Sequence, residues 1–475
     1  MRPLLPLALA LALGACVAGP PPEVATPVPE LPNNFLYAPD SRTSASLAAL
    51  LPSGDPAFST LADRALENAP SLAEALARVE AARAGARRAG AERLPRLDAD
   101  ANVTGNRINP NQFGDGAGGF IDTEQISYGA NLVASWDADL FGRLRSQERA
   151  ALARIDAADA SANAVRIALV SEIAGNVTDW RTLAARTDAL QQDVEAAQQL
   201  ARLAKSREDA GLSPGFDRVR AESQASASRS RLAALQSERA RIIGRLVTLT
   251  GMDGQSVNAA LAQGAPTLEP APAPASLPSE LLANRPDVLA AAADLAATDQ
   301  DLAATARARF PRLTLSGVLG LLAFNPGDLF DEDSLVGTLA AGVAGPLLDF
   351  GRIEAEINGA AANKKAAFAA YRGAVFQALG DAETAYGLIA ASDAEAQLAV
   401  QERDELARAA SLANTRYRAG LADFLTVLEA RRAADASGER AAAALGRATR
   451  ARILLWQALG GEREGVADGG KSPPP

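Results

Sequence analysis

The chain has 475 residues, and its 57 acidic residues outnumber its 47 basic residues, which gives a formal net charge of −10. An acidic chain without a basic cluster argues against a nucleic-acid-binding protein, because phosphate contacts need Lys and Arg. The sequence has no His and one Cys, which excludes most nucleophilic and metal chemistry, and it has no phosphate loop of the right spacing. We therefore expect no enzyme, no catalytic residues and no metal site.

The chain begins with a predicted export signal. A positive N-terminus precedes an apolar run from Leu4 to Leu13, which is too short to span a membrane as a helix. The segment Leu13-Gly-Ala-Cys16 resembles a bacterial lipoprotein signal, whose Cys receives lipid and becomes the mature N-terminus. We expect residues 1–15 to be removed, Cys16 to carry covalent lipid such as palmitate, and the following Val17 to favour the outer membrane. The alternative is an ordinary signal peptide with an incidental Cys.

A Pro-rich stretch follows, and residues 16–54 are predicted to form an extended, lipidated tether. Asp55-Pro56 has the pattern of a helix N-cap followed by Pro in the first turn, so a short helix is expected to about Asn68. A further helix is expected over 71–94, with a counterpart over 287–310.

Four segments alternate apolar and polar residues with a period of two, which predicts strands at about 96–105, 126–137, 312–321 and 335–345. Their length of about 10 residues suits tilted strands that cross a bilayer, although a soluble hairpin packed on a helix has the same pattern. In an exported chain we favour the membrane. The polar positions are then expected to keep a lumen wet: Asp98, Asp100, Asn102, Ser127, Asn131 and Thr314.

Four strands cannot close a barrel, since small membrane barrels have at least about eight. Open strand edges are not tolerated in lipid. Several copies of the chain must therefore share one barrel if these strands cross a membrane.

Two long segments, about 141–207 and 350–416, carry small and apolar residues at helical spacings of three and four. A helix of that length would span roughly 100 Å at about 1.5 Å per residue. Shorter return helices are expected at about 216–250 and 421–459. Taken alone, these patterns also fit a plain antiparallel coiled coil.

The chain repeats itself. Phe141-Gly-Arg143 recurs as Phe350-Gly-Arg352, and Ala210-Gly-Leu212 recurs as Ala419-Gly-Leu421, both at an offset of 209 residues. A repeat of this length defines the architecture. We expect a first structural repeat over 55–251, a connector over 252–278, a second repeat over 279–461 and a disordered tail over 462–475.

Three motifs carry a family resemblance: Asp139-Leu-Phe-Gly-Arg143, Leu348-Asp-Phe-Gly-Arg352 and the run Tyr417–Ala430. In this order they resemble the TolC superfamily, and more closely its lipidated OprM/NodT branch, from Leu13 to Gly461. The resemblance implies a mainly α fold with a small β part. It implies a homotrimer with one 12-stranded β-barrel and a periplasmic α-helical tunnel. It also implies the outer-membrane channel of a tripartite RND-type efflux pump for drugs or other small molecules, with a periplasmic adaptor and an inner-membrane transporter as partners.

The turns after the two long helices, which we call the tip turns, are the candidate partner sites. The resemblance implies that an adaptor meets the tip, so we expect contacts at Gly211, Leu212, Gly420, Leu421, Val427 and Leu428. Acidic residues near the tip could form a constriction by threefold symmetry: Asp209, Asp404 and Asp423. The alternatives are helix capping and seam packing for the first set, and solvated surface for the acids. Pro214-Gly215 in the first turn departs from Asp423-Phe424 in the second, so the two tips need not grip a partner equally.

Two alternative functions remain compatible with the sequence. The same fold could serve type I protein secretion or metal export, although two Met and no His disfavour export of a soft metal. A periplasmic lipoprotein scaffold without a pore is the other rival. The alternating strands argue against it, because a scaffold needs no lipid-facing stripe.

Overall fold

The computed structural model describes residues 22–39, 46–107, 124–264 and 270–461. The predicted signal over 1–15, the lipidation site Cys16 and the predicted tail over 462–475 lie outside the described residues. The chain divides into two compact units. We call them the sheet unit, which holds 79–158 and 291–371, and the helix unit, which holds 28–78, 159–290 and the described residues from 372 onward.

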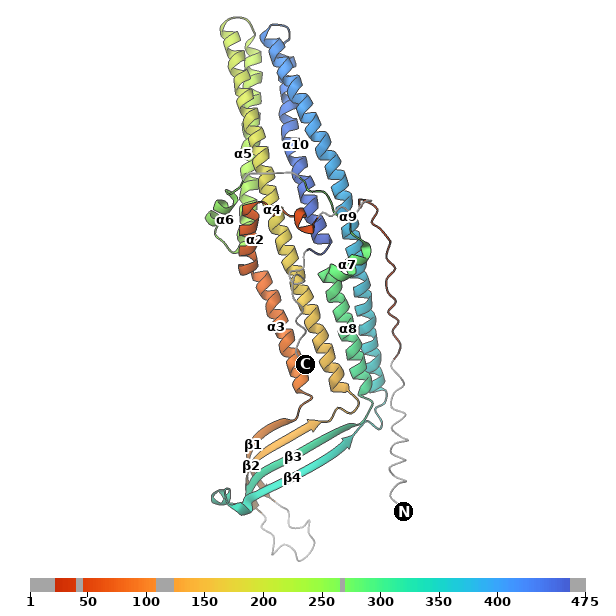
Figure 1. Ribbon diagram of the computed structural model, residues 1–475. Helices are drawn as coiled ribbons and strands as arrows, with labels where there is room; N and C mark the ends of the chain where they lie inside the picture. The colour runs from red at the N-terminus through yellow and green to blue at the C-terminus, as the bar shows by residue number, and fades with distance from the viewer. Residues whose placement is uncertain (1–21, 40–45, 108–123, 265–269, 462–475) are drawn as a thin grey trace, which may run out of the picture. The chain divides into compact units, whose positions relative to one another are not determined.

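The fold is mainly α-helical with one antiparallel sheet (Figure 1). Its order contains the predicted repeat, because α3-β1-β2-α4-α5 recurs as α8-β3-β4-α9-α10. The elements are η2 (Leu47–Leu50), α2 (Pro56–Asn68), α3 (Pro70–Ala91), β1 (Arg96–Arg107), β2 (Glu124–Asp137), α4 (Arg143–Asp209), α5 (Gly215–Thr250), α6 (Gly254–Leu261), α7 (Pro278–Asn284), α8 (Pro286–Arg307), β3 (Arg312–Ala323), η4 (Pro326–Asp328), η5 (Glu332–Ser334), β4 (Leu335–Ala344), α9 (Arg352–Arg418) and α10 (Phe424–Ala458).

The two long helices, α4 and α9, have 67 residues each. The described helices include none that is both long enough and apolar enough to cross a membrane. Two short helices, α6 and α7, occupy and border the segment predicted as a plain connector. The last return helix begins at Phe424 and not at 421, because the preceding residue, Asp423, is its N-cap.

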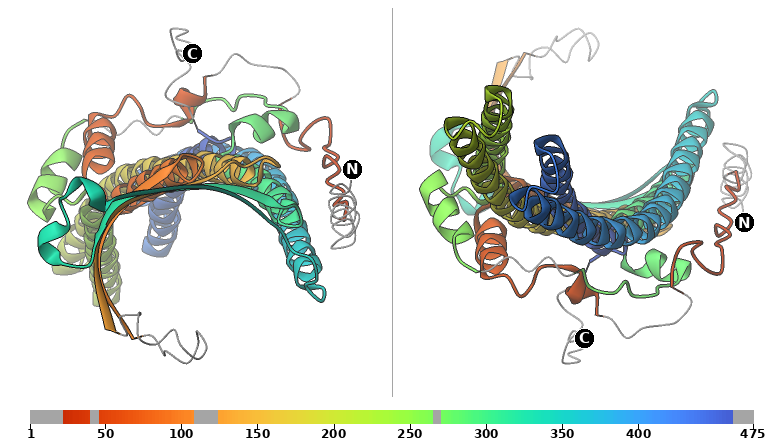
Figure 2. Two further views of the ribbon diagram at one scale, coloured as in Figure 1. Left: turned by 90° about the horizontal axis from the view of Figure 1, so that it is seen from below. Right: turned by 90° about the horizontal axis from the view of Figure 1, so that it is seen from above.

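In the sheet unit, the strands pair in chain order, β1-β2-β3-β4, and every pair is antiparallel. The sheet is curved (Figure 2). Among the described residues, β1 and β4 each have one strand neighbour, so each leaves an edge of unpaired backbone groups.

The two long helices begin with similar caps that use acids at different places in the repeat. The Asp139 carboxylate accepts hydrogen bonds from the N–H groups of Leu144 and Arg145, both at 2.9 Å. In the second copy, Asp349 accepts from Ile353 at 2.9 Å. These bonds satisfy amides that have no partner within the helix, which explains why an acid precedes Phe-Gly-Arg in both motifs.

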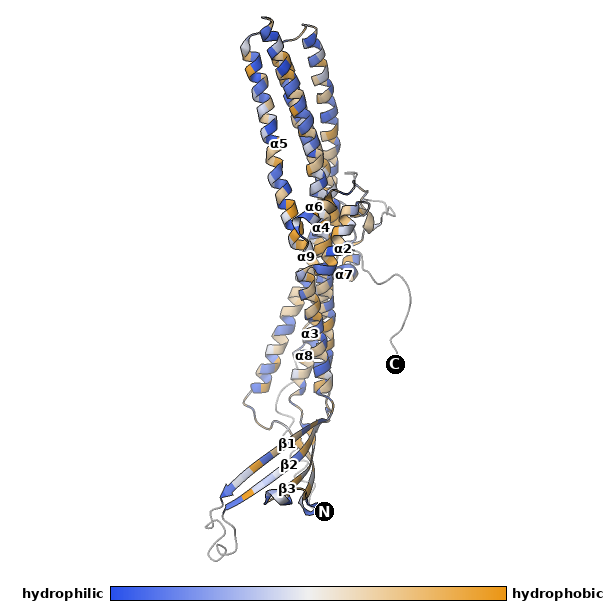
Figure 3. Cartoon of the chain, turned by 90° about the vertical axis from the view of Figure 1, so that its left-hand side faces the viewer, coloured by the Kyte–Doolittle hydropathy of each residue, from blue (hydrophilic) through white to orange (hydrophobic). Residues whose placement is uncertain are grey.

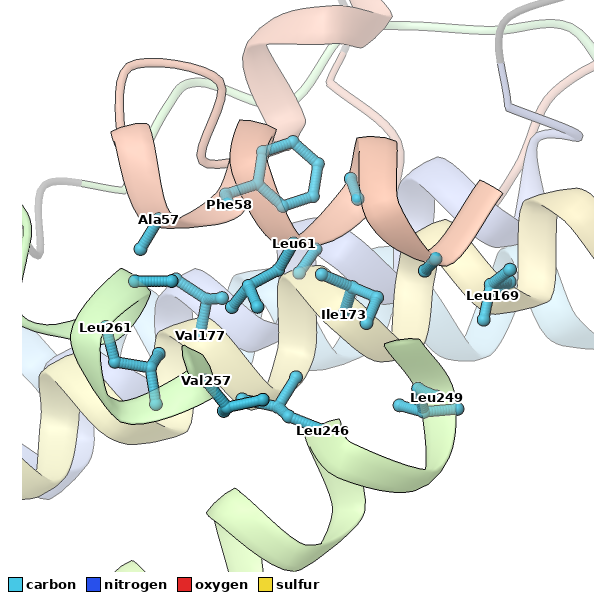
Figure 4. Close-up of a cluster of buried hydrophobic side chains, with 14 of the residues drawn as sticks. Ala57, Phe58, Leu61, Leu169, Ile173, Val177, Leu246, Leu249, Val257 and Leu261 are labelled. Carbon is cyan, nitrogen blue, oxygen red and sulfur yellow. The ribbon is translucent and has the colours of Figure 1, made fainter. Parts of the chain in front are cut away.

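The helix unit has its largest apolar core where α2 crosses α4, α5 and α6 (Figure 4). Phe58 and Leu61 of α2 face Ile173 and Val177 of α4, and Leu246 of α5 closes the cluster. The predicted cap forms here, since the Asp55 carboxylate accepts from the Ala57 N–H at 2.9 Å.

Three buried arginines of the helix unit connect segments that are far apart in the sequence. The Arg181 guanidinium binds the Asp55 carboxylate and donates to the Leu261 carbonyl at 2.9 Å. Arg285 donates to the Ala458 carbonyl at 3.1 Å, and Arg452 donates to the Ala271 carbonyl at 2.7 Å. Buried charges of this kind stabilise only when they are paired and hydrogen-bonded, as these are.

Part of the predicted tether is packed and not free. Phe35 is buried against Tyr386 of α9, with ring centroids 5.4 Å apart, and the Leu36 N–H donates to the Glu383 carboxylate at 3.0 Å. Tyr386 in turn donates to the Pro274 carbonyl at 2.9 Å.

Candidate functional site: the two sheet faces and the helix tips

One face of the sheet is polar. Directly paired residues of an antiparallel sheet point to the same side, and the register pairs Asp100 with Asn131 and Asp137 with Thr314. Following these pairs places all six predicted lumen residues on this face, with other polar residues beside them: Asp98, Asp100, Asn102, Thr104, Ser127, Asn131, Ser135, Asp137, Thr314, Ser316 and Thr338. The shared face is a property of the register.

Hydrogen bonds connect neighbours on this polar face. The Asn131 side-chain amide donates to the Asp100 carboxylate at 3.2 Å across β1 and β2. Gly320 of β3 lies beside the same Asn131, and a Cβ there would stand 2.8 Å from the Ala130 carbonyl oxygen. The glycine therefore leaves room for the polar pair.

The opposite face is apolar. In Figure 3, hydrophilic and hydrophobic segments alternate along β1. Many of the large side chains on this face are solvent-exposed within the chain, and Leu339 of β4 is 88% exposed. They include Leu97, Val103, Ile126, Leu132, Trp136, Leu319, Leu335, Leu339 and Val343. A contiguous apolar surface of this kind marks contact with lipid or with another protein.

The two tip turns share one backbone geometry. Gly211 has φ +70° and Gly420 has φ +71°, a region that favours glycine. The Leu212 N–H donates to the Arg207 carbonyl and the Leu421 N–H donates to the Arg416 carbonyl, both at 2.8 Å. These are Schellman turns, which bond the last carbonyls of a helix.

The leucines that follow these glycines project outward. Leu212 is 68% exposed and Leu421 is 70% exposed. Phe216, in the first turn of α5, is also exposed, and the Arg220 guanidinium lies 4.3 Å from the centre of its ring. The tips thus present apolar side chains on short turns.

A small core, the tip cluster, lies directly behind the turns. It joins α4, α5, α9 and α10 through Leu200, Ala204, Ala221, Ala413, Tyr417, Phe424, Val427 and Leu428. Val427 and Leu428 are buried in it, so the expectation that both meet an adaptor is wrong for this conformation. The helical spacing of Val427 and Leu428 reflects packing inside the chain, and neither side chain offers a surface to a partner.

The three predicted constriction acids are not brought together into a cluster within the chain. Asp423 caps α10 by accepting from the Thr426 N–H at 2.7 Å. Hydrogen bonding by the Thr426 side chain, together with this backbone bond, holds the pKa of the Asp423 carboxyl below the usual range. Asp404 is exposed and pairs with its neighbour Arg403 at 2.8 Å. Asp209 is exposed as the last residue of α4. No group of three or more potential metal ligands occurs in the part of the chain that the structure describes.

Sequence reasoning missed a buried acidic pair, Asp193 of α4 and Asp435 of α10. A signal was present: Asp435 lies seven residues after buried Leu428, and Asp193 lies three after buried Leu190. Both spacings place an acid on an apolar helix stripe.

A sheet with one polar and one exposed apolar face, followed in each repeat by a long helix with a capped apolar tip, fits an outer-membrane channel protein. The family model described as "Outer membrane efflux protein" matches residues 61–252 and 277–461. The chain belongs to this family of outer-membrane efflux channels, which are not enzymes.

Relatives match along nearly the whole chain. The pyoverdine export outer membrane protein OpmQ of Pseudomonas aeruginosa is 29% identical over 98% of this chain and 99% of its own. The solvent efflux pump outer membrane protein SrpC of Pseudomonas putida is 30% identical over 88% of each chain. Among solved structures, the outer-membrane channel OprN superposes with a TM-score of 0.83 at 25% identity, over 94% of this chain and 99% of that one. The CmeC channel of Campylobacter jejuni shares the fold, with a TM-score of 0.84 at 19% identity over 94% and 96%.

Proposed function

We propose that this chain is the exit channel of a tripartite efflux pump, in which three copies share one barrel and conduct small organic molecules out of the cell. The observation that carries the proposal is the sheet register. It collects polar side chains on one face and exposed apolar side chains on the other, and it leaves the β1 and β4 edges unpaired. A wall between lipid and a wet lumen has these properties.

The unpaired edges support assembly of several copies. In lipid an unpaired backbone edge is very costly, so β1 of one copy is expected to pair with β4 of the next. Each copy supplies four strands. Two copies would give eight strands, the lower limit for such barrels, and three would give twelve, the number that the family resemblance implies. We propose three.

The proposed cargo is a small organic molecule. Relatives of this chain are named for export of pyoverdine and for efflux of solvents. The polar face mixes hydroxyl and amide groups with both signs of charge, such as Arg96 beside Asp98 at 2.8 Å. Such a surface favours hydrated solutes in general, and the choice of cargo then belongs to the inner-membrane transporter, which we propose is of the RND type.

The tips are the proposed docking points for a periplasmic adaptor. Leu212 and Leu421 point outward from rigid turns, so they offer apolar contacts at little entropic cost. Val427 and Leu428 would support these turns from inside. We further propose that Cys16 carries the lipid that anchors the N-terminus. Asp209 and Asp404, which are exposed, stay candidates for a ring of charge about the threefold axis.

The experiment compares two adjacent positions of β4 that face opposite sides. Leu339→Lys places a charge on the apolar face, which costs about 2–4 kcal/mol at the centre of a bilayer. Thr338→Lys places the same charge on the polar face. In cells that lack their own channel, we expect Thr338→Lys to assemble in the outer membrane and to restore efflux of a fluorescent dye, and Leu339→Lys to fail in both. Equal behaviour of the two variants would refute the assignment of the faces.

A further inference from the structure

A buried pair of carboxyl groups joins α4 to α10 behind the tip cluster. Asp435 is 1% exposed and Asp193 is 6% exposed. Asp193 lies seven residues before Leu200, and Asp435 lies seven residues after Leu428, both members of the tip cluster. Seven residues are two helical turns, about 10 Å along the helix.

This contact differs from the other charged contacts between the same helices. Asp179 of α4 accepts a hydrogen bond from Arg450 of α10 at 3.0 Å. Glu439 of α10 accepts one at 2.8 Å from Arg186, which also binds Glu238 of α5, so each of these acids is hydrogen-bonded to a guanidinium. At the buried pair, two acids share Arg431. Its Nε lies 2.7 Å from Asp435 Oδ1, and its terminal nitrogen Nη2 lies 3.8 Å from Asp193 Oδ1.

The hydrogen bonds of the pair are incomplete. Among the described residues, neither carboxylate oxygen of Asp435 receives a hydrogen bond, and the same holds for Oδ2 of Asp193. The Arg431 Nε–H is not directed at Asp435 despite the short distance, so that contact is an ion pair without a hydrogen bond. A buried acceptor without a donor costs about 1–3 kcal/mol, and more when it is charged.

The charges around the pair come from two helices. Arg431 is on α10 itself, and Arg231 is on α5, where it donates to the Ser228 hydroxyl at 3.1 Å. Burial, the largest effect, disfavours the ionised form of both acids and outweighs the two arginines, and repulsion by Asp435 adds to it at Asp193. The net result raises the pKa of Asp193 to about 7 and raises that of Asp435, so the pair titrates as one unit.

We propose that Asp193 and Asp435 form a proton-binding site: one shared proton, placed between the two carboxyl groups, bonds α4 to α10 behind the tip cluster. The proton supplies the donor that the unpaired oxygens lack, and the remaining single negative charge matches Arg431. When the proton leaves, two buried carboxylates repel each other and the contact loosens. That this loosening frees the tip to open rests on the proposed function, whereas the proton site does not.

The sign of the pH effect follows from the raised pKa values. Between the ordinary Asp value of about 4 and about 7, the closed contact binds one proton more than the opened one. Raising the pH through this window therefore weakens the contact by about tenfold per pH unit in its opening constant, and the effect levels off above neutral pH. Below the window both states are protonated and the contact is strongest.

Infrared difference spectroscopy of the full-length protein in detergent tests the site directly. A protonated carboxyl group has a carbonyl stretching band that a carboxylate lacks. We expect a band that disappears with a midpoint near neutral pH, and that is absent from Asp193→Asn and from Asp435→Asn. The matched control is Glu439→Gln, one helical turn further along α10, which removes an acid that is hydrogen-bonded to Arg186 and should keep the band. Absence of the band from the wild type at pH 6, or its survival in both Asn variants, would overturn the proposal.

Hydrogen exchange of the same samples tests the bond between the helices. After correction for the intrinsic pH dependence of exchange, amides of α10 near residue 435 should open more readily as the pH rises from 5 to 7. The two Asn variants should lose this dependence and Glu439→Gln should keep it. A dependence that persists in both Asn variants would contradict a shared proton. Loss of the infrared band on adding Ca²⁺ at pH 6 would instead assign the pair to a cation and would likewise overturn it.

Discussion

The two helix tips have the same turn but begin their return helices differently. In both turns a glycine with positive φ closes the long helix with the same pair of hydrogen bonds. At the second tip, Asp423 then caps α10 with its carboxylate. At the first tip, Pro214 stands at the start of α5 and makes no side-chain cap bond.

The comparison separates the backbone turn, which the two tips share, from the side chains around it, which differ. The backbone turn depends on glycine and is identical in the two copies, so it defines where each tip lies. The cap depends on a side chain that the first copy lacks, and the tip cluster takes different large side chains from the two copies. We expect the second tip to be the stiffer one, and substitutions at the two tips test this difference.

The largest effect is expected in the tip cluster. Leu428→Ala removes a buried side chain from the second tip and leaves a cavity, which costs about 2–5 kcal/mol in comparable cores. The matched control is Leu421→Ala, which shortens an exposed side chain and should change local stability little. Hydrogen exchange of the amides at the start of α10 measures both. If Leu421→Ala increased exchange at the second tip as much as Leu428→Ala does, the tip cluster would not be what stabilises that tip.

An intermediate effect is expected at the turn glycines. Gly211→Ala and Gly420→Ala place a side chain where φ is about +70°. No other atom lies within 4 Å of either new Cβ, so the cost is conformational, about 1–2 kcal/mol. Because the turns are alike, the two variants should lose equal protection in their own tips. A clearly larger loss at one tip would show that the turns are not equivalent.

The smallest effect is expected at the helix starts. Asp423→Ala removes a cap bond and should increase fraying of α10, whereas Pro214→Ala removes no cap bond from α5. The lowered pKa of Asp423 gives a pH signature, because its ionised form is the one that accepts the bond. The cap is present above the ordinary Asp pKa and is lost as the pH falls below its own value. Amide protection in the first turn of α10, followed from pH 6 to pH 3, should therefore fall in the wild type and not in Asp423→Ala.

The strands and the turns could be predicted from the sequence because their signals are local. A period of two determines which residues share a sheet face, so Asp98 and Thr314 could be assigned to one side before any pairing was known. A glycine after a basic last turn indicates a helix end. The repeat doubled each of these signals, since every motif in one copy could be checked against the other.

The contacts between distant segments could not be predicted in the same way. Arg181, Arg285 and Arg452 bind carbonyl groups of residues far away in the sequence, and nothing around them in the sequence shows this. Periodicity placed Val427 and Leu428 on a seam but could not say that the seam lies inside the chain. The short helix α6 was missed because a Pro-rich neighbourhood concealed its eight residues.

The most direct test of the account is the number of chains that share one barrel. The full-length protein would be extracted from outer membranes in detergent, its protein mass determined with the detergent contribution subtracted, and its conductance measured in a planar bilayer. If three chains share one barrel, the complex contains three chains and conducts ions. A monomer that does not conduct, released into solution when Cys16 is replaced, would contradict a shared barrel and leave the apolar sheet face to be explained by a protein contact.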